Sequence, residues 1–244
     1  MRNILIKLSY NGYAYHGWQV QSNAKTVQEV LQNAVEIICN KRESITGCSR
    51  TDSGVHANEY CCTLRTENQI PCNKLVNALN GNLPQDIAVL SCAEVDADFH
   101  PRYDCKEKEY IYKIWNSEVR NPFFQNTHLH YKYKLDAEKL DKVSKDFIGT
   151  HDFSAFCAAG GSVEDKVRTV KSFYVERSGD EVIMRVSADG FLYNMVRIMV
   201  GTLLDISSGR IDENSIPAII ESKKRENAGV TAPPQGLYLN KVTY

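Results

Sequence analysis

Residues 47–57, Gly-Cys-Ser-Arg-Thr-Asp-Ser-Gly-Val-His-Ala, hold the densest group of potentially reactive side chains in this sequence. Arg50, Asp52 and His56 place a guanidinium, a carboxylate and an imidazole within seven residues. Glycines at both ends of the segment permit turns with positive φ. A carboxylate on a tight loop beside a strand can serve as a nucleophile or a general base. It can equally close an Asx turn with Ser53 and Gly54, and both interpretations stay open on composition alone.

The Asp52-Ser53-Gly54 triplet also resembles the active-site triplet of aspartic proteases. That chemistry needs two carboxylates that share one proton. The nearest second candidate, around Asp189, lacks the hydroxyl residue, and the residues before Asp52 are polar rather than a hydrophobic strand. The sequence therefore disfavours a protease.

The loop lies in a chain of alternating strand and helix patterns. The first half predicts a strand, a helix, a strand, a short helix and a strand, at residues 4–10, 26–39, 60–64, 72–80 and 87–95. The second half predicts a strand, a helix, a hairpin, two helices and a strand, at residues 110–114, 136–148, 167–177 with 181–188, 191–207, 211–222 and 237–244.

This order predicts an α+β fold of two similar sheet-plus-helix halves, ferredoxin-like or RRM-like, covering residues 1–105 and 106–244. We expect one mixed, mainly antiparallel sheet with helices on one side and a catalytic cleft between the halves. Thr26 and Glu29 have the spacing of a capping box, and Asp136 and Asp212 are placed to cap later helices.

Composition excludes several classes of protein. The chain has 244 residues and a formal net charge of −1, with the hydrophobic and charged content of an ordinary globular protein, so it is neither disordered nor a coiled coil. Near-zero charge neither requires nor excludes a nucleic-acid partner. The sequence has no apolar run of bilayer length and no signal peptide, which predicts a cytoplasmic protein without a membrane. Eight cysteines without a C-x-x-C pair predict free, buried thiols and no zinc site.

Residues 49–57 resemble the catalytic motif of the tRNA pseudouridine synthase A (TruA) family. The resemblance extends in order along almost the whole chain, through residues 10–19, 26–29, 80–87, 99–102, 108–112, 190–197 and 232–239. His16 stands where the family commonly has another aromatic residue.

The resemblance implies an isomerase that converts uridine to pseudouridine at positions 38–40 of the tRNA anticodon stem-loop. It implies no metal, no organic cofactor, and a homodimer that binds tRNA. Carried over residue by residue, it makes Asp52 the essential carboxylate, Tyr110 the tyrosine that stacks on the base, and Arg197 the partner of the carboxylate. Arg50 falls where the family has an arginine that interacts with the RNA around the displaced nucleotide.

The reaction breaks the N1–C1′ bond, turns the uracil and joins C5 to C1′, so no atom is gained or lost. A carboxylate can attack C1′ or C6, or take a proton from the ribose, and each route needs Asp52 ionised. Arg197 lies among apolar helix residues and should have a partner, expected to be Asp52, unless it snorkels to solvent. Tyr110 is alternatively a core aromatic that shares a strand face with Tyr112.

Extruding a stacked uridine costs free energy that phosphate and stacking contacts must offset. The candidate cations are Arg50, Arg102, Lys106, Lys108, Arg168 and residues 223–225. The histidines at positions 56, 100 and 151 are expected to be structural, and Trp18 and Phe153 to be core or cleft-wall aromatics. The rival function is an RNA-binding module without chemistry, since alternating small sheets and helices suit RNA recognition. The joint presence of Asp52, Tyr110 and Arg197 argues against that rival.

Overall fold

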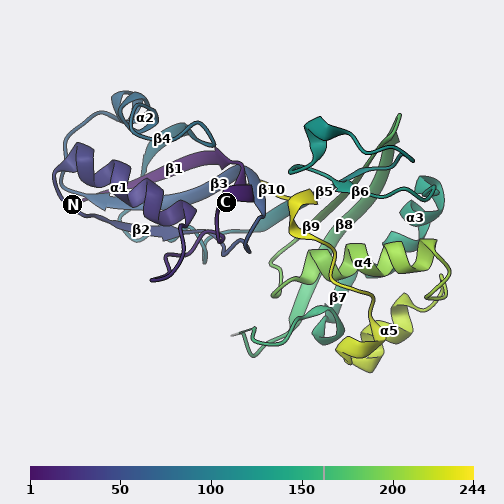
Figure 1. Cartoon of the computed structure of the whole chain (residues 1–244). Helices are drawn as coiled ribbons and strands as arrows, with labels where there is room; N and C mark the ends of the chain where they lie inside the picture. Colours follow the sequence, from purple (N-terminus) through teal and green to yellow (C-terminus); the bar gives the residue numbers. More distant parts are fainter. Residues whose placement is uncertain (162) are drawn as a thin grey trace. The chain divides into compact units, whose positions relative to one another are not determined.

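The computed structural model describes residues 1–161 and 163–244, and the chain divides into two compact units (Figure 1). The first unit comprises Met1–Lys106 together with Tyr238–Tyr244, and the second comprises Glu107–Leu237. Each unit has its own strands and helices. The chain ends in the first unit, because residues 238–244, which include most of the last strand, belong to it.

The first unit is built on five strands. Four of them follow the order β4 (Ile87–Val95), β1 (Arg2–Tyr10), β3 (His56–Thr66) and β10 (Leu237–Thr243). β2 (Ser44–Gly47) pairs with the C-terminal half of β3, and β10 pairs with the first two residues of β3 along the same edge. All pairs are antiparallel except β10 with β3, where Tyr238 lies opposite His56. The strand at 237–244 was predicted from sequence, whereas β2 was missed.

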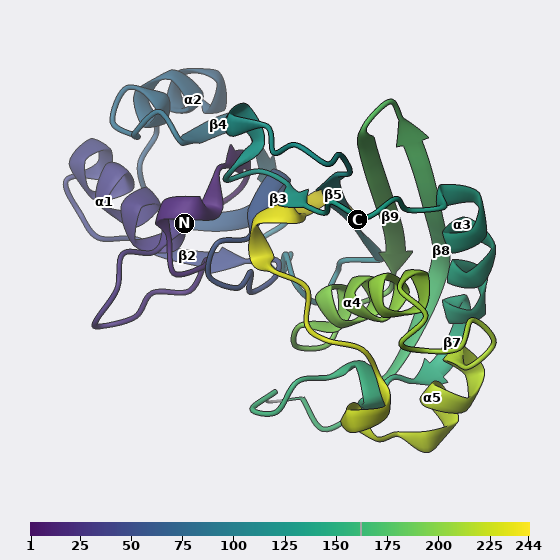
Figure 2. The same cartoon turned by 45° about the vertical axis from the view of Figure 1, so that its right-hand side comes forward.

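Alternation along β1 makes one face of this sheet apolar. Ile4, Ile6 and Leu8 are fully buried, and the residues between them are partly exposed. Burying each such side chain stabilises the fold by about 1.5–3 kcal/mol. Two helices, α1 (Val27–Cys39) and α2 (Cys72–Asn80), lie side by side on the unit (Figures 1 and 2). The Thr26 side chain accepts a hydrogen bond from the Glu29 amide, which confirms the predicted cap.

The second unit is built on a long hairpin. β8 (Val167–Ser178) and β9 (Glu181–Ala188) are antiparallel, as predicted, and β9 pairs in turn with β5 (Glu107–Trp115). β7 (Gly149–Asp152) extends the sheet beyond β8, and β6 (Leu129–His130) runs parallel to β5. The helices are α3 (Ala137–Ser144), α4 (Met195–Ser207) and α5 (Ile216–Ser222).

Both units also contain short 3-10 turns. They lie at Gly12–Ala14 in the first unit and, in the second, at Pro122–Phe124, Lys145–Phe147, Ser154–Phe156, Arg225–Asn227 and Pro234–Gly236.

α4 lies across β8 and β9 in both ribbon views (Figures 1 and 2) and carries eleven buried residues. Tyr110 pairs with Val186, which pairs with Phe173, so these three side chains point to the same face of the sheet. All three are buried. Tyr112, two residues along β5, shares that face, as predicted.

Three predicted helices are shorter than expected. α3 tightens into a 3-10 turn after Ser144, whose hydroxyl donates to the Asp141 carbonyl at 2.7 Å. α4 begins at residue 195 because Asn194 adopts a left-handed conformation with φ of 60°. Asp212 closes a turn on the Asn214 amide at 2.9 Å instead of capping a helix, so α5 begins at residue 216.

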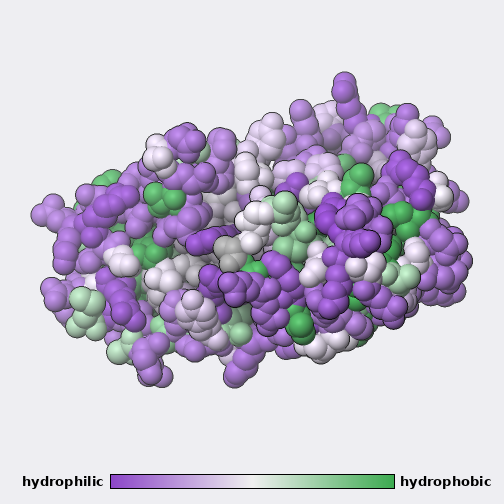
Figure 3. All heavy atoms as spheres, turned by 90° about the horizontal axis from the view of Figure 1, so that it is seen from below, coloured by the Kyte–Doolittle hydropathy of each residue, from purple (hydrophilic) through white to green (hydrophobic). Residues whose placement is uncertain are grey.

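The α+β class and the mainly antiparallel pairing are confirmed. None of the described helices is long and apolar enough to cross a bilayer. The face shown in Figure 3 is mostly hydrophilic, with apolar side chains in separate spots. All eight cysteines are thiols rather than disulfides, but the prediction that all are buried is wrong. Cys48, Cys61 and Cys62 are buried, and the other five are partly exposed.

Candidate active site

Asp52 lies on the loop between β2 and β3, at partial exposure, next to the buried Thr51. The turn is closed by the main chain: the Val55 amide donates to the Asp52 carbonyl at 3.1 Å. The Gly54 amide, which an Asx turn would direct to the Asp52 side chain, donates to the Tyr15 carbonyl at 3.1 Å. The main chain therefore closes this turn, and another segment holds it in place.

That segment is residues 11–18, which follows β1. The Tyr10 hydroxyl shares a hydrogen bond of 2.8 Å with the Thr51 hydroxyl, and the Trp18 amide donates to the Thr51 carbonyl at 3.2 Å. A Cβ at Gly12 would lie 1.9 Å from the Val55 carbonyl oxygen, so the two backbones touch there. The loop that carries Asp52 is thus fixed on both sides of the carboxylate.

Tyr15 anchors this bracing segment. Its side chain is 1% exposed, and its hydroxyl donates to the Asp86 carboxylate at 2.7 Å. Burial raises the pKa of Tyr15 well above its ordinary value, and the hydrogen bond to Asp86 raises the pKa further. Tyr15 therefore stays protonated and serves as a fixed donor.

His56 is structural, as expected. It is 1% exposed, its Nδ1 accepts a hydrogen bond from the Gly12 amide at 3.0 Å, and its ring stacks on Tyr238 with centroids 4.5 Å apart. Because Nδ1 is an acceptor, it carries no proton in this arrangement. His56 thus joins the bracing segment to β10.

Replacing Gly17 by alanine should displace the Asp52 loop. Gly17 has φ of +80°, and a Cβ there would lie 2.3 Å from the Thr51 carbonyl oxygen. We expect the free energy of unfolding to fall by about 2–4 kcal/mol, from backbone strain and overlap together. Thermal or denaturant unfolding measures this, and the activity proposed below should fall with it.

Gly179→Ala is the matched control for that experiment, because its φ is also positive, at +59°, but nothing lies within 4 Å of the added Cβ. It should lose only the strain, about 1–2 kcal/mol. Equal losses of stability in the two variants would show that the close approach of Gly17 to Thr51 does not hold the loop.

Tyr110 and Arg197 both belong to the second unit. Tyr110 is 6% exposed and meets Phe191 edge-on, with ring centroids 5.0 Å apart. Tyr112 is fully buried and donates to the Pro233 carbonyl at 2.7 Å, so it has the structural role of a core aromatic. Tyr110 is thus nearly buried within its own unit, and one of its contacts is the Phe191 ring.

Arg197 lies in the first turn of α4 and is partly buried. Its Nε donates to the Ala232 carbonyl at 2.7 Å and its Nη1 to the Asn194 side chain at 2.8 Å. Its charge lies close to Tyr112, where it opposes the rise that burial causes in the pKa of that tyrosine. The guanidinium is thus held on fixed partners of its own unit, which does not fit an arginine extended into solvent.

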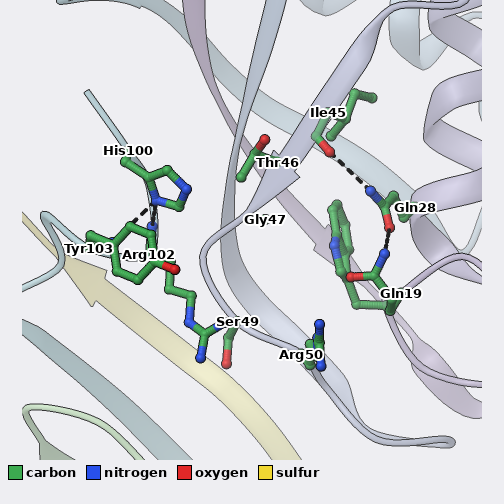
Figure 4. A pocket seen from close by; sticks show the side chains of 11 residues that line it. Gln19, Gln28, Ile45, Thr46, Gly47, Ser49, Arg50, His100, Arg102 and Tyr103 are labelled. Carbon is green, nitrogen blue, oxygen red and sulfur yellow. Dashed lines mark hydrogen bonds between the residues drawn. The ribbon is translucent and has the colours of Figure 1, made fainter. Parts of the chain in front are cut away.

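Other predicted cations of the second unit have structural partners. Lys223 forms an ion pair with Asp152 at 2.8 Å, and this hydrogen bond lowers the pKa of the aspartate. Arg225 donates to the Gly229 carbonyl at 2.9 Å, and Arg168 to the Asp165 carbonyl at 3.2 Å. In the first unit, by contrast, Arg50 and Arg102 are exposed and line one pocket (Figure 4).

The described residues contain no group of three His, Cys, Asp or Glu side chains arranged to hold a metal ion. Burial raises the pKa of the Cys61 thiol to about 12, and that of Cys62 also rises. Both thiols are therefore protonated at neutral pH and are poor nucleophiles. The carboxylate of Asp52, by contrast, is a group of a type suited to nucleophilic or basic chemistry.

A family model described as tRNA pseudouridine synthase matches residues 8–104 and 143–244, which is most of the chain. The chain belongs to the tRNA pseudouridine synthase family. Proteins named tRNA pseudouridine synthase A are 46% identical in Thermoanaerobacter sp. (strain X514) and 45% identical in Acetivibrio thermocellus, over 100% of both chains in each case. The family suggested by residues 49–57 is confirmed, and with it the class of enzyme, an isomerase.

Solved structures resemble the chain far less closely. A crystal structure of a Cbf5-Nop10-Gar1 complex matches 99% of this chain and 58% of its own, at 13% identity and a TM-score of 0.38. A likeness at this level carries no conclusion about the site.

Sequence reasoning missed the residues that brace the loop. The hydrogen bond between Tyr15 and Asp86 joins positions 71 residues apart, and no local sequence pattern predicts it. Gly17 offered a signal, because glycine is the default residue where a backbone adopts positive φ or closely approaches another group.

Proposed function

We propose that this protein isomerises uridine to pseudouridine at positions 38–40 of the tRNA anticodon stem-loop, without a metal or an organic cofactor. Family membership and full-length identity of 42–46% to several proteins named tRNA pseudouridine synthase A support the substrate. The observation that carries the chemistry is the position of Asp52, on a loop that Tyr10, Tyr15 and Trp18 hold rigidly.

In the proposed reaction, the N1–C1′ bond of the uridine breaks, the uracil turns, and C5 bonds to C1′. C5 then loses its proton and N1 gains one, so the nucleotide keeps its composition. The Asp52 carboxylate attacks C1′ or C6, or removes a proton from the ribose. Each route uses the ionised carboxylate, so a cation that stabilises this charge assists all three.

We assign that cation to Arg197 and the stacking surface for the uracil to Tyr110. Arg197 suits the task because two of its nitrogens are already held by fixed acceptors, so the guanidinium loses little freedom when it pairs with a carboxylate. Arg50, two residues before Asp52, is proposed to contact the RNA around the extruded nucleotide.

We further propose that the protein acts as a homodimer in the cytoplasm, with tRNA as its macromolecular substrate. Sedimentation or light scattering of the purified protein tests the dimer, and a species of twice 27.6 kDa is expected.

Removing the Tyr110 hydroxyl should slow the reaction and spare binding. Tyr110→Phe keeps the ring beside Phe191, so we expect tRNA affinity within about twofold of wild type. We propose that the hydroxyl also relays the C5 proton, so the single-turnover rate should fall by about 10²-fold. Tyr112→Phe is the control: it loses the bond to Pro233, so it should lower stability and leave the rate unchanged. A Tyr110→Phe protein that turns over like wild type would limit Tyr110 to stacking.

The function is tested with an unmodified tRNA transcript, purified protein and a chelator in the buffer. We expect pseudouridine at positions 38–40, mapped by carbodiimide modification and primer extension. The rival function, an RNA-binding module without chemistry, predicts binding of the same tRNA with no pseudouridine at any position.

A further inference from the structure

The first unit contains a pocket of about 220 Å³ beside the Asp52 loop, and Asp52 is not among its lining residues. Its walls come from three segments that are distant in sequence: residues 18–28, the end of β2 with residues 49–50, and the turn at residues 100–103. In Figure 4, His100, Arg102 and Tyr103 lie on one side, Gln19 and Gln28 on the other, and Ser49 and Arg50 in the lower part of the view. The pocket is smaller than most small-molecule sites, which are about 300–1,000 Å³, so it suits one unit of a polymer better than a whole cofactor.

The charge of this pocket is positive. Arg50 and Arg102 are its two charged lining residues, and neither an aspartate nor a glutamate lines it. Within residues 1–161 and 163–244, neither guanidinium is engaged in an ion pair, and Arg102 instead lies 5.8 Å from the centre of the Tyr103 ring. Two exposed guanidinium groups at one opening are a typical arrangement for binding a phosphate.

The turn that presents Arg102 is preformed. His100 Nδ1 accepts hydrogen bonds from the amides of Arg102 at 3.1 Å and Tyr103 at 3.3 Å, and the His100 amide donates to the Asp104 carboxylate at 2.8 Å. The Asp104 carboxylate therefore binds a main-chain amide of its own turn. Tyr103 is 76% exposed, with its ring against that of His100 at 4.3 Å. An exposed ring beside an arginine is the usual platform for an unpaired base.

The opposite wall is also fixed. The buried Gln28 donates to the Ile45 carbonyl at 3.0 Å and accepts from the Gln19 side chain at 2.9 Å. A Cβ at Gly47 would lie 2.5 Å from the Trp18 indole nitrogen, so β2 lies directly on this ring. The pocket therefore keeps its shape without a ligand, and the amide of Gln19 can offer polar groups to a base edge.

We propose that this pocket binds a second nucleotide of the same RNA, next to the uridine that reacts. Arg50 and Arg102 hold its phosphate, and the Tyr103 ring stacks on its base. This inference rests on the proposed function for its ligand. It adds a second binding site, for a nucleotide that does not react. Binding at this site fixes the register of the RNA at Asp52.

The test compares Arg102→Ala and Tyr103→Ala with the wild type on unmodified tRNA. Both truncations spare the main-chain bonds to His100, so the turn should persist. Arg42→Ala is the matched control, because Arg42 is an exposed arginine of the same unit, paired with Glu36 at 2.9 Å and outside the pocket.

We expect the Kd of each pocket variant to rise about tenfold. For Arg102→Ala, the salt dependence of binding should weaken. The negative slope of log association constant against log salt concentration should shrink in magnitude by about 0.7–0.9, the amount for one lost phosphate contact. The single-turnover rate at saturating protein should fall by a smaller factor than the affinity. An ethylation-interference experiment identifies the phosphates whose ethylation weakens binding. At one phosphate, ethylation should weaken binding to the wild type but have no effect on binding to Arg102→Ala. Arg42→Ala should keep the wild-type pattern.

Pocket variants that bind tRNA as tightly as wild type, with every sensitive phosphate unchanged, would overturn the proposal. So would a loss of saturating rate at unchanged affinity, because that would assign Arg102 to the chemical step. These results are distinct from failure of the proposed function, in which the wild-type protein itself forms no pseudouridine.

Discussion

Asp52→Asn should bind tRNA with wild-type affinity and form no pseudouridine. The amide fills the same space on a loop that main-chain bonds to Tyr15 and Trp18 already position, so the loop should not move. An amide can neither act as a nucleophile here nor accept the ribose proton. We expect a loss of at least about 10⁴-fold in the single-turnover rate, measured by pseudouridine formation with protein in excess over tRNA.

Asp52→Glu separates the charge of this residue from its position. It keeps the carboxylate but moves it by one methylene, and a displacement of about 1 Å can cost about 10²-fold. We therefore expect activity between those of wild type and Asp52→Asn. Normal turnover by the Asp52→Asn protein, once deamidation is excluded by mass spectrometry, would remove Asp52 from the chemistry.

Arg197→Leu should lower the rate of the chemical step by about tenfold near pH 5, less at neutral pH, and change tRNA affinity much less. An opposite charge beside a carboxylate typically stabilises its ionised form by about 1.4–4 kcal/mol. Without it, Asp52 holds its proton more tightly, so the acid limb of the pH–rate profile should move to higher pH. Single-turnover rates between pH 5 and 8 measure the shift, and activity should recover partly as the pH rises.

The variant also leaves the Ala232 carbonyl without its side-chain donor, which should lower the free energy of unfolding by about 1–3 kcal/mol. Asn194→Gly controls for this structural part. It removes the contact to Nη1, keeps the Arg197 charge, and tolerates the left-handed conformation at residue 194. Its pH–rate profile should match wild type. Equal losses of affinity and rate in Arg197→Leu would make Arg197 an RNA-binding residue instead.

Local signals predicted much of the fold. Alternation of apolar residues located β1, and the spacing of Thr26 and Glu29 located the start of α1, because each depends on neighbours along the chain. The ends of α3 and α5 were misplaced because other contacts decide them. Ser144 bonds to Asp141, and Asp212 closes a turn that resembles a helix cap in sequence. The partner of the last strand could not be predicted either, since the parallel pairing of Tyr238 with His56 joins strands from distant parts of the sequence.

The candidate site shows the same division. The residue types in 49–57 indicated the chemistry, and the ordered motifs indicated the family. The contacts that make the loop rigid could not be predicted, because hydrogen bonds such as that of Tyr15 with Asp86 join side chains 71 residues apart. The pocket beneath Arg50 and Arg102 was hidden for the same reason: its walls meet only after β2 has paired with β3.

The most direct test of the account is a crystal structure of the Asp52→Asn protein with an anticodon stem-loop bound. We expect a uridine extruded from the stack against Tyr110, with the side chain at position 52 facing it. The Arg197 guanidinium should lie within about 4 Å of that side chain, the limit for an ion pair in the wild type. A bound stem-loop whose uridines stay stacked, with Arg197 far from position 52, would contradict the account.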